Sequence, residues 1–216
     1  MNSPDAVIEA VRELLPVLRD RAQETEDRRA LSAETVKSLA ETGFFRLLQP
    51  ARFGGFEADP MHFYTAVRLI AGACGSTGWV ASVIAVHAWQ MGLFPDQAQQ
   101  DVWGEDSETR MSSSYAPTGK VRAVEGGYRI SGRWSFSSGC DHATWVLLGG
   151  IVMGDDGQPP DFRTFLVPIG DSSPKNLRAS DVLMTATRGA PSRSFAVKSR
   201  PAMSGRPIVE KYPGEI

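Results

Sequence analysis

The first half of the chain places apolar residues at the spacing of amphipathic helices. Ser3 and Pro4 supply a cap and a first helical turn, and Asp59 and Pro60 repeat this start signal later in the chain. Gly43 is a typical helix stop. The pattern predicts helices over residues 4–26, 33–43, 60–74, 76–91 and 95–104. These helices together indicate an all-helical domain over residues 1–108.

After Met111 the hydrophobic pattern takes the period of strands. Gly126-Gly127 and Asp155-Asp156-Gly157 are turn signals between apolar runs, and the first is a strong hairpin signal. The pattern predicts strands over residues 111–115, 120–125, 128–135, 144–152 and 162–167. Helices followed by antiparallel strands indicate an α+β fold, with a partial β domain over residues 109–170.

Residues 171–216 form a tail without a sustained period. The tail is rich in Ser, Arg and Pro and is net basic, whereas the rest of the chain is acidic. We expect it to be irregular or disordered because it has too little patterned apolar sequence to build a core.

The composition narrows the kinds of partner. The chain has 216 residues and a net charge of -2, which does not favour a nucleic-acid partner. The apolar run from Trp79 to Phe94 is interrupted by polar residues and is shorter than a bilayer span, so we expect a buried helix and no membrane partner. Two cysteines and an N-terminus with acids at Asp5 and Glu9 favour the cytoplasm. A small-molecule partner fits these features best.

Two stretches carry side chains suited to a flat ligand with polar edges. WSFSSGCDHATW, from Trp134 to Trp145, combines aromatics with hydroxyl groups directly after a predicted strand. Trp79, Val83 and His87 lie at steps of four on one face of a predicted helix. The structural alternative is a strand that ends in a Ser-Ser-Gly turn with core tryptophans, and a core histidine with satisfied hydrogen bonds.

Two further patterns do not define a site. Gly72, Gly75 and Gly78 follow no strand and precede no Gly-Lys-Ser/Thr, so we interpret them as allowing close helix packing. Cys140-Asp141-His142 has metal-ligating types, but neighbouring residues cannot complete a tetrahedral site alone. We therefore expect no metal.

Three segments in the same order resemble one family. They are the loop RFGGF at residues 52–56, the helix ACGSTGWVASVIAVHAW that ends at Trp89, and SSSYAPTGKVRAVEGGYRISGRWSFSSGCDHATWVLLG at residues 112–149. Together they resemble the oxygenase component of two-component flavin-dependent monooxygenases, which have the acyl-CoA dehydrogenase fold. The sequence of these segments is most similar to that of hydroxylases of the phenolic secosteroid of bacterial steroid degradation, followed by 4-hydroxyphenylacetate hydroxylases.

The resemblance implies a mechanism and a site. Reduced FMN or FAD, supplied by a separate flavin reductase, would form a C4a-hydroperoxide that hydroxylates a phenol ortho to its hydroxyl group. His87 would hydrogen-bond the phenol and Ser138 would lie near flavin N5, so both are candidate catalytic residues. The resemblance assigns flavin binding to Trp79, Ser113, Ser114, Tyr115, Phe136, Ser137 and Ser138. It also implies a homotetramer.

The chain departs from the family pattern in its C-terminal part. Family members continue into a helical bundle that is missing here, and the tail matches nothing in their pattern, so we expect a truncated or frame-shifted copy. An acyl-CoA dehydrogenase proper is a weaker alternative because SSSYAPTG lacks the Thr-Glu-Pro-x-x-Gly-Ser wording of those enzymes. A non-catalytic fragment is the other alternative.

Overall fold

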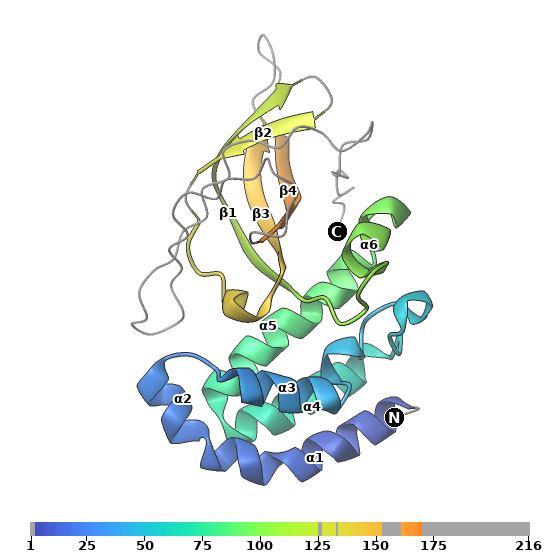
Figure 1. The fold of residues 1–216 in the computed structure, drawn as a ribbon, viewed down its shortest axis with the longest axis vertical. Helices are drawn as coiled ribbons and strands as arrows, with labels where there is room; N and C mark the ends of the chain where they lie inside the picture. The colour runs from blue at the N-terminus through green and yellow to red at the C-terminus, as the bar shows by residue number, and fades with distance from the viewer. Residues whose placement is uncertain (1–2, 125–126, 133, 153–160, 170–216) are drawn as a thin grey trace. The chain divides into compact units, whose positions relative to one another are not determined.

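The computed structural model describes residues 3–124, 127–132, 134–152 and 161–169. The chain divides into two compact units. The helical unit is Met1–Ser112 with Asp141–Ala143, and the β unit is Ser113–Cys140 with Thr144–Ile216. The α+β class and the change from helices to strands after residue 110 are confirmed (Figure 1). The predicted tail and the Asp155-Gly157 turn lie outside the described residues.

The predicted first helix is two helices, α1 (Pro4–Asp20) and α2 (Ala22–Arg28). The Ser3 hydroxyl accepts a hydrogen bond from the amide of Ala6 at 3.2 Å, which confirms the predicted cap. The prediction of one helix was wrong at Arg21, where the chain turns. The Arg21 guanidinium there pairs with Glu34, which lies beyond α2 in the helix Ala33–Glu41. The break is therefore stabilised by a contact between residues 13 positions apart in the sequence.

The other helices begin and end close to their predicted positions. They are α3 (Ala33–Glu41), α4 (Pro60–Ala73), α5 (Gly75–Met91) and α6 (Asp96–Trp103). Ser32 caps α3 by accepting from the amide of Thr35 at 3.1 Å, and Asp59 caps α4 by accepting from Met61 at 2.8 Å. Gly43 has the left-handed φ of 80° that the sequence predicts for a helix stop.

Helix α4 packs against both α1 and α5 in the helical unit (Figure 1). A Cβ on Gly78 would lie 2.5 Å from the Cβ of Ala71, so this glycine allows the close packing that the sequence predicts. The same prediction was wrong for Gly72 and Gly75, which face open space. The core of this unit contains Val11, Leu39, Phe44, Leu47, Ile70 and Ile84.

The four described strands form one sheet in the order β2-β1-β3-β4. The strands are β1 (Met111–Val124), β2 (Gly127–Ser131), β3 (Trp145–Val152) and β4 (Asp161–Pro168). The antiparallel pair β1 and β2 confirms the predicted hairpin, with Val124 opposite Gly127. Strands β3 and β4 are also antiparallel, with Leu148 opposite Phe165.

Two strand predictions were wrong. The sequence predicts two strands on either side of Pro117 and Gly119, but β1 runs through both residues. Gly119 has a packing role, since a Cβ there would lie 2.1 Å from Cζ2 of Trp134. Strand β2 ends at Ser131, four residues before its predicted end, and Trp134 then packs into the core of the β unit.

Trp134 is a core residue. It is 1% exposed, and its Nε1 donates to the carbonyl oxygen of Gly149 at 2.8 Å. The idea that the whole stretch from Trp134 forms a wall against a ligand was therefore wrong for Trp134, and the structural alternative is correct there. Val121, Val146, Leu148 and Phe165 belong to the same core.

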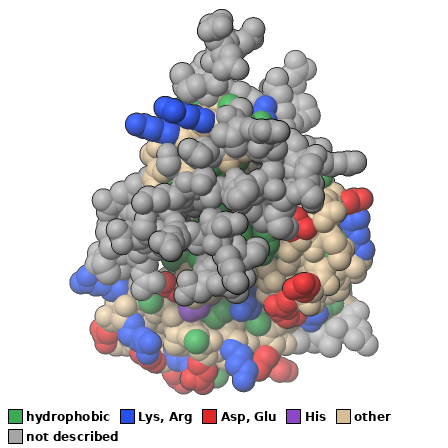
Figure 2. Space-filling model, turned by 45° about the horizontal axis from the view of Figure 1, so that its top comes forward, with side chains coloured by type: hydrophobic (Ala, Val, Ile, Leu, Met, Phe, Trp, Pro, Cys, Tyr) green, Lys and Arg blue, Asp and Glu red, His purple; other side chains and the backbone are tan. Residues whose placement is uncertain are grey.

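On the face drawn in Figure 2, basic and acidic side chains are interspersed over the described residues. Within the described part of the chain, no helix has both the length and the apolar character needed to cross a bilayer.

Candidate functional site

The helix face that the sequence singled out lies on α5. Trp79 is 53% exposed, whereas His87 on the same face is 3% exposed and Val83 is half-buried. Helix α5 consists largely of apolar residues, and the exposed side chain of Trp79 presents a large aromatic ring on it. The stripe thus combines an exposed ring with a buried imidazole.

Burial controls the protonation state of His87. Desolvation lowers its pKa from 6.5 to about 4, and a side-chain hydrogen bond with Gln90 opposes this shift only partly. The imidazole is therefore neutral at neutral pH. A neutral imidazole has one nitrogen that accepts a hydrogen bond and one that donates, so His87 can accept a hydrogen bond from a hydroxyl group.

Strand β1 of the β unit carries Ser113, Ser114 and Tyr115. Both serines are buried, and Tyr115 is exposed. The hydroxyl of Ser114 donates to the carbonyl oxygen of Ser135 at 2.6 Å. This bond joins β1 to the segment just before Phe136, so it holds two groups of candidate residues together within the β unit.

The segment after Trp134 places an aromatic ring beside buried hydroxyls. Phe136 is 71% exposed and has a left-handed φ of 61°, whereas Ser137 and Ser138 are buried. The Oγ of Ser137 is buried, and among the described residues it has no hydrogen-bond partner. A non-glycine residue at positive φ costs about 1–3 kcal/mol, and such strained residues tend to cluster at functional sites.

These features of the β unit fit a planar ligand with polar edges. Phe136 and Tyr115 offer exposed rings, and Ser137 holds a buried hydroxyl that a ligand atom could pair. An isoalloxazine ring has both an aromatic face and polar nitrogen and oxygen atoms along its edge. The residues present in this chain therefore fit a flavin.

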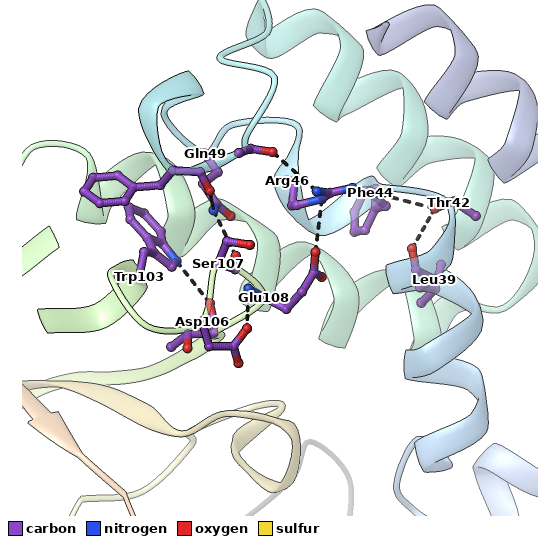
Figure 3. A network of polar contacts seen from close by, with 12 residues as sticks. Leu39, Thr42, Phe44, Arg46, Gln49, Trp103, Asp106, Ser107 and Glu108 are labelled. Atoms are coloured by element: carbon purple, nitrogen blue, oxygen red, sulfur yellow. Dashed lines mark hydrogen bonds and ion pairs between the residues drawn. The ribbon is translucent and has the colours of Figure 1, made fainter. Parts of the chain in front are cut away.

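A polar network that the sequence did not reveal fixes the segment leading into β1 (Figure 3). Nε2 of Gln49 donates to the carbonyl oxygens of Phe53 at 2.8 Å and Ser107 at 2.9 Å. Nε1 of Trp103 donates to the carbonyl oxygen of Thr109 at 3.2 Å. A Cβ on Gly55 would lie 2.0 Å from the carbonyl oxygen of Gln49, so the RFGGF loop needs glycine there.

Arg110 was also missed, because no local pattern marks it. Its Nε donates to the carbonyl oxygen of His142 at 3.2 Å, and its guanidinium lies 5.4 Å from the ring centroid of Phe45. The side chain of His142 hydrogen-bonds the backbone of Leu31, while burial, the largest cause, lowers its pKa. Among the described residues, His, Cys, Asp and Glu side chains do not gather in any group of three or more that could hold a metal ion.

Comparisons with known proteins identify relatives. Residues 4–106 match the family model "Acyl-CoA dehydrogenase, N-terminal domain". The oxygenase subunit HsaA of a flavin-dependent monooxygenase from Rhodococcus jostii (strain RHA1) is 60% identical over 158 residues, which are 73% of this chain and 41% of the relative. HsaA from Mycobacterium tuberculosis (strain ATCC 25618 / H37Rv) is 49% identical over 193 residues, which are 89% of this chain and 48% of the relative.

A solved structure also shows similarity to a hydroxylase. The crystal structure of 3-HSA hydroxylase from Rhodococcus sp. RHA1 superposes with a TM-score of 0.79 and 52% identity, over 90% of this chain and 50% of that chain. The chain thus spans about half the length of the relatives it matches. Because the Mycobacterium match covers 193 residues, it includes part of the chain after residue 170. The frame-shifted origin of the tail stays a prediction.

The resemblance seen in the three sequence segments is confirmed by these matches. The family model and the superposition also confirm the acyl-CoA dehydrogenase-like fold, and the relatives are flavin-dependent. The chain is a homologue of the oxygenase components of flavin-dependent monooxygenases, with the helical N-terminal domain of the acyl-CoA dehydrogenase fold followed by a small β-sheet.

Proposed function

We propose that the chain carries flavin- and phenol-binding residues of an oxygenase component that hydroxylates a phenol at the carbon ortho to its hydroxyl group. The 60% identity over 158 residues with an HsaA oxygenase subunit is the observation that carries this proposal. A phenolic secosteroid is the favoured substrate class, because the superposed structure is a 3-HSA hydroxylase. A phenol of the 4-hydroxyphenylacetate type is the second choice.

The aromatic and hydroxyl side chains would hold the flavin. Trp79, Tyr115 and Phe136 are exposed rings suited to cover a planar ring system and exclude water from it. Ser113, Ser114, Ser137 and Ser138 supply buried hydroxyls, and Ser138 is the candidate to hydrogen-bond the flavin near N5. Bound reduced flavin would activate dioxygen and supply the oxygen atom that is transferred.

His87 would orient and polarise the phenol. Its pKa of about 4 lies roughly six pKa units below that of a phenol, which is about 10 for tyrosine. Complete proton transfer in the ground state would therefore cost about 8 kcal/mol. His87 would accept a hydrogen bond from the phenol and take more of the proton only as the ring carbon is attacked. Such assistance contributes about 10²–10⁴-fold to the rate.

The remaining partners follow from the proposed chemistry. A separate reductase would supply reduced FMN or FAD, and a cytoplasmic location suits a protein that depends on this supply. Assembly into a homotetramer is part of the same proposal. The predicted division into residues 1–108, 109–170 and 171–216 also stays a proposal.

The test uses the 216-residue chain with reduced flavin. Reduced FMN and FAD are titrated under anaerobic conditions, and oxygen labelled with ¹⁸O is then added with a panel of phenols. We expect a change in the flavin spectrum on binding and a catechol that carries one ¹⁸O atom. Binding without product supports the alternative of a non-catalytic fragment. If the chain neither binds reduced flavin nor forms product with any phenol of the panel, the proposal is overturned.

A further inference from the structure

Two segments carry the candidate flavin-binding serines, and each continues into the helical unit. Ser113 and Ser114 follow Arg110 closely in the sequence, while Ser137 and Ser138 closely precede His142. Arg110 and the segment Asp141–Ala143 both belong to the helical unit. Any bond between these two flanking positions therefore constrains how far apart the serine segments can move.

Arg110 makes that bond. Its Nε donates to the carbonyl oxygen of His142 at 3.2 Å, and its guanidinium lies over the ring of Phe45, which is buried. A guanidinium that stacks on an aromatic face and donates from a fixed nitrogen has little freedom to rotate. The bond therefore has a defined direction and length.

Both ends of this bond are fixed independently. On one side, the ion pair between Arg46 and Glu108 at 3.3 Å joins the bonds from Gln49 and Trp103 in holding the segment before Arg110 (Figure 3). On the other side, the His142 side chain hydrogen-bonds the backbone of Leu31. The connection thus links two anchored segments.

A second bond closes the arrangement within the β unit. The hydroxyl of Ser114 donates to the carbonyl oxygen of Ser135 at 2.6 Å. The strand that carries Ser113 and the segment that carries Ser137 are therefore joined twice, once in each unit. Two segments of a chain that are joined at two points keep their spacing better than segments joined at one point. The second bond blocks rotation about the first.

We propose that Arg110 is a positioning residue that sets the spacing between Ser113 and Ser114 on one segment and Ser137 and Ser138 on the other, and so prepares the β unit to bind flavin. This inference rests on the proposed function. Arg110 acts through the carbonyl group of His142 and does not itself contact the flavin. The charge of Arg110 alone does not suffice, because the direction of the Nε bond determines the spacing.

The test compares Arg110→Met and Arg110→Lys with Arg68→Met, which removes an exposed arginine from α4. In the flavin-free chain, hydrogen exchange of the amides in residues 134–143 is measured beside the thermal midpoint. We expect both Arg110 variants to exchange about tenfold faster there, since each loses one charge-assisted hydrogen bond. The lysine keeps a charge near Phe45 but has no Nε, so it should not rescue. Arg68→Met should behave as wild type.

Flavin binding then tests the functional part. The dissociation constant of reduced flavin should rise about tenfold in both Arg110 variants, and the visible circular dichroism of the bound flavin should change. Exchange equal to wild type in Arg110→Met, or full rescue by lysine, overturns the positioning role. A wild-type chain that binds no flavin overturns the proposed function, and the exchange measurement still decides whether Arg110 fixes the two segments.

Discussion

The candidate residues of the helical unit and those of the β unit are held in different physical ways. On α5, Trp79 and His87 occupy a regular helix, and burial is the main cause that keeps the imidazole of His87 neutral. In the β unit, Phe136 and Ser137 occupy irregular backbone that the buried Trp134 and the Ser114 bond hold in place. The comparison shows that a change of pH can alter the α5 residues by protonating His87. The residues around Phe136 are instead altered by mutations that remove packing or hydrogen bonds.

Trp134→Ala should have the largest effect, and it should act on the β unit. We expect a loss of about 3–5 kcal/mol in the free energy of unfolding, because a fully buried ring and its hydrogen bond to Gly149 are removed. Urea denaturation followed by circular dichroism measures it. Trp89→Ala is the matched control, since Trp89 is exposed and should change stability by less than about 0.5 kcal/mol. Equal losses would contradict the core role of Trp134.

His87 should make the helical unit sensitive to acid. Its pKa is lowered to about 4 in the folded state, so between pH 6.5 and 4 the unfolded state binds more protons and stability falls as pH falls. The contribution of this residue is about 3 kcal/mol over that range. Urea unfolding at several pH values, with His87→Gln as the variant that cannot titrate, measures it. The same pH slope in both proteins would show that another group is responsible.

Two of the buried serines of the β unit, Ser114 and Ser137, should affect stability differently. Ser114→Ala loses its bond to Ser135 and should destabilise the flavin-free chain by about 1 kcal/mol. Ser137→Ala removes a buried hydroxyl without a partner among the described residues and should be neutral or stabilising by up to about 1 kcal/mol. Both should weaken binding of reduced flavin. Stability losses of equal size would mean that Ser137 is bonded in the flavin-free chain.

Phe136→Ala should give the smallest effect on stability. Phe136→Gly should relieve the left-handed backbone and stabilise the chain by about 1 kcal/mol, whereas Phe136→Ala should leave stability nearly unchanged because the ring is exposed. Thermal unfolding distinguishes the two variants, and titration with reduced flavin should show weaker binding in both. A large loss of stability in Phe136→Ala would mean that the ring packs against the protein.

The sequence correctly predicted the helix caps and stops, which depend only on residues close together in the chain. The caps at Ser3 and Asp59 and the stop at Gly43 are local signals, and all were confirmed. The break at Arg21 was missed because its pairing with Glu34 joins residues distant in sequence.

The candidate site shows the same limit. The residue types on α5 and around Ser137 could be chosen from motifs, but the bond from Arg110 to His142 and the network around Gln49 link segments far apart in the chain. The inward turn of Trp134 depends on Gly119 and Gly149, which no periodic pattern connects to it. Assignment of these residues therefore requires the structure.

Because Asp141–Ala143 belongs to the helical unit, this unit cannot be completed early while the chain is synthesised on the ribosome. Although the last α-helix of that unit ends at Trp103, its remaining segment emerges only after β1 and β2 have been made. A nascent chain halted before Asp141 would lack the carbonyl partner of Arg110. The N-terminal region is therefore completed late, after part of the sheet has already left the exit tunnel.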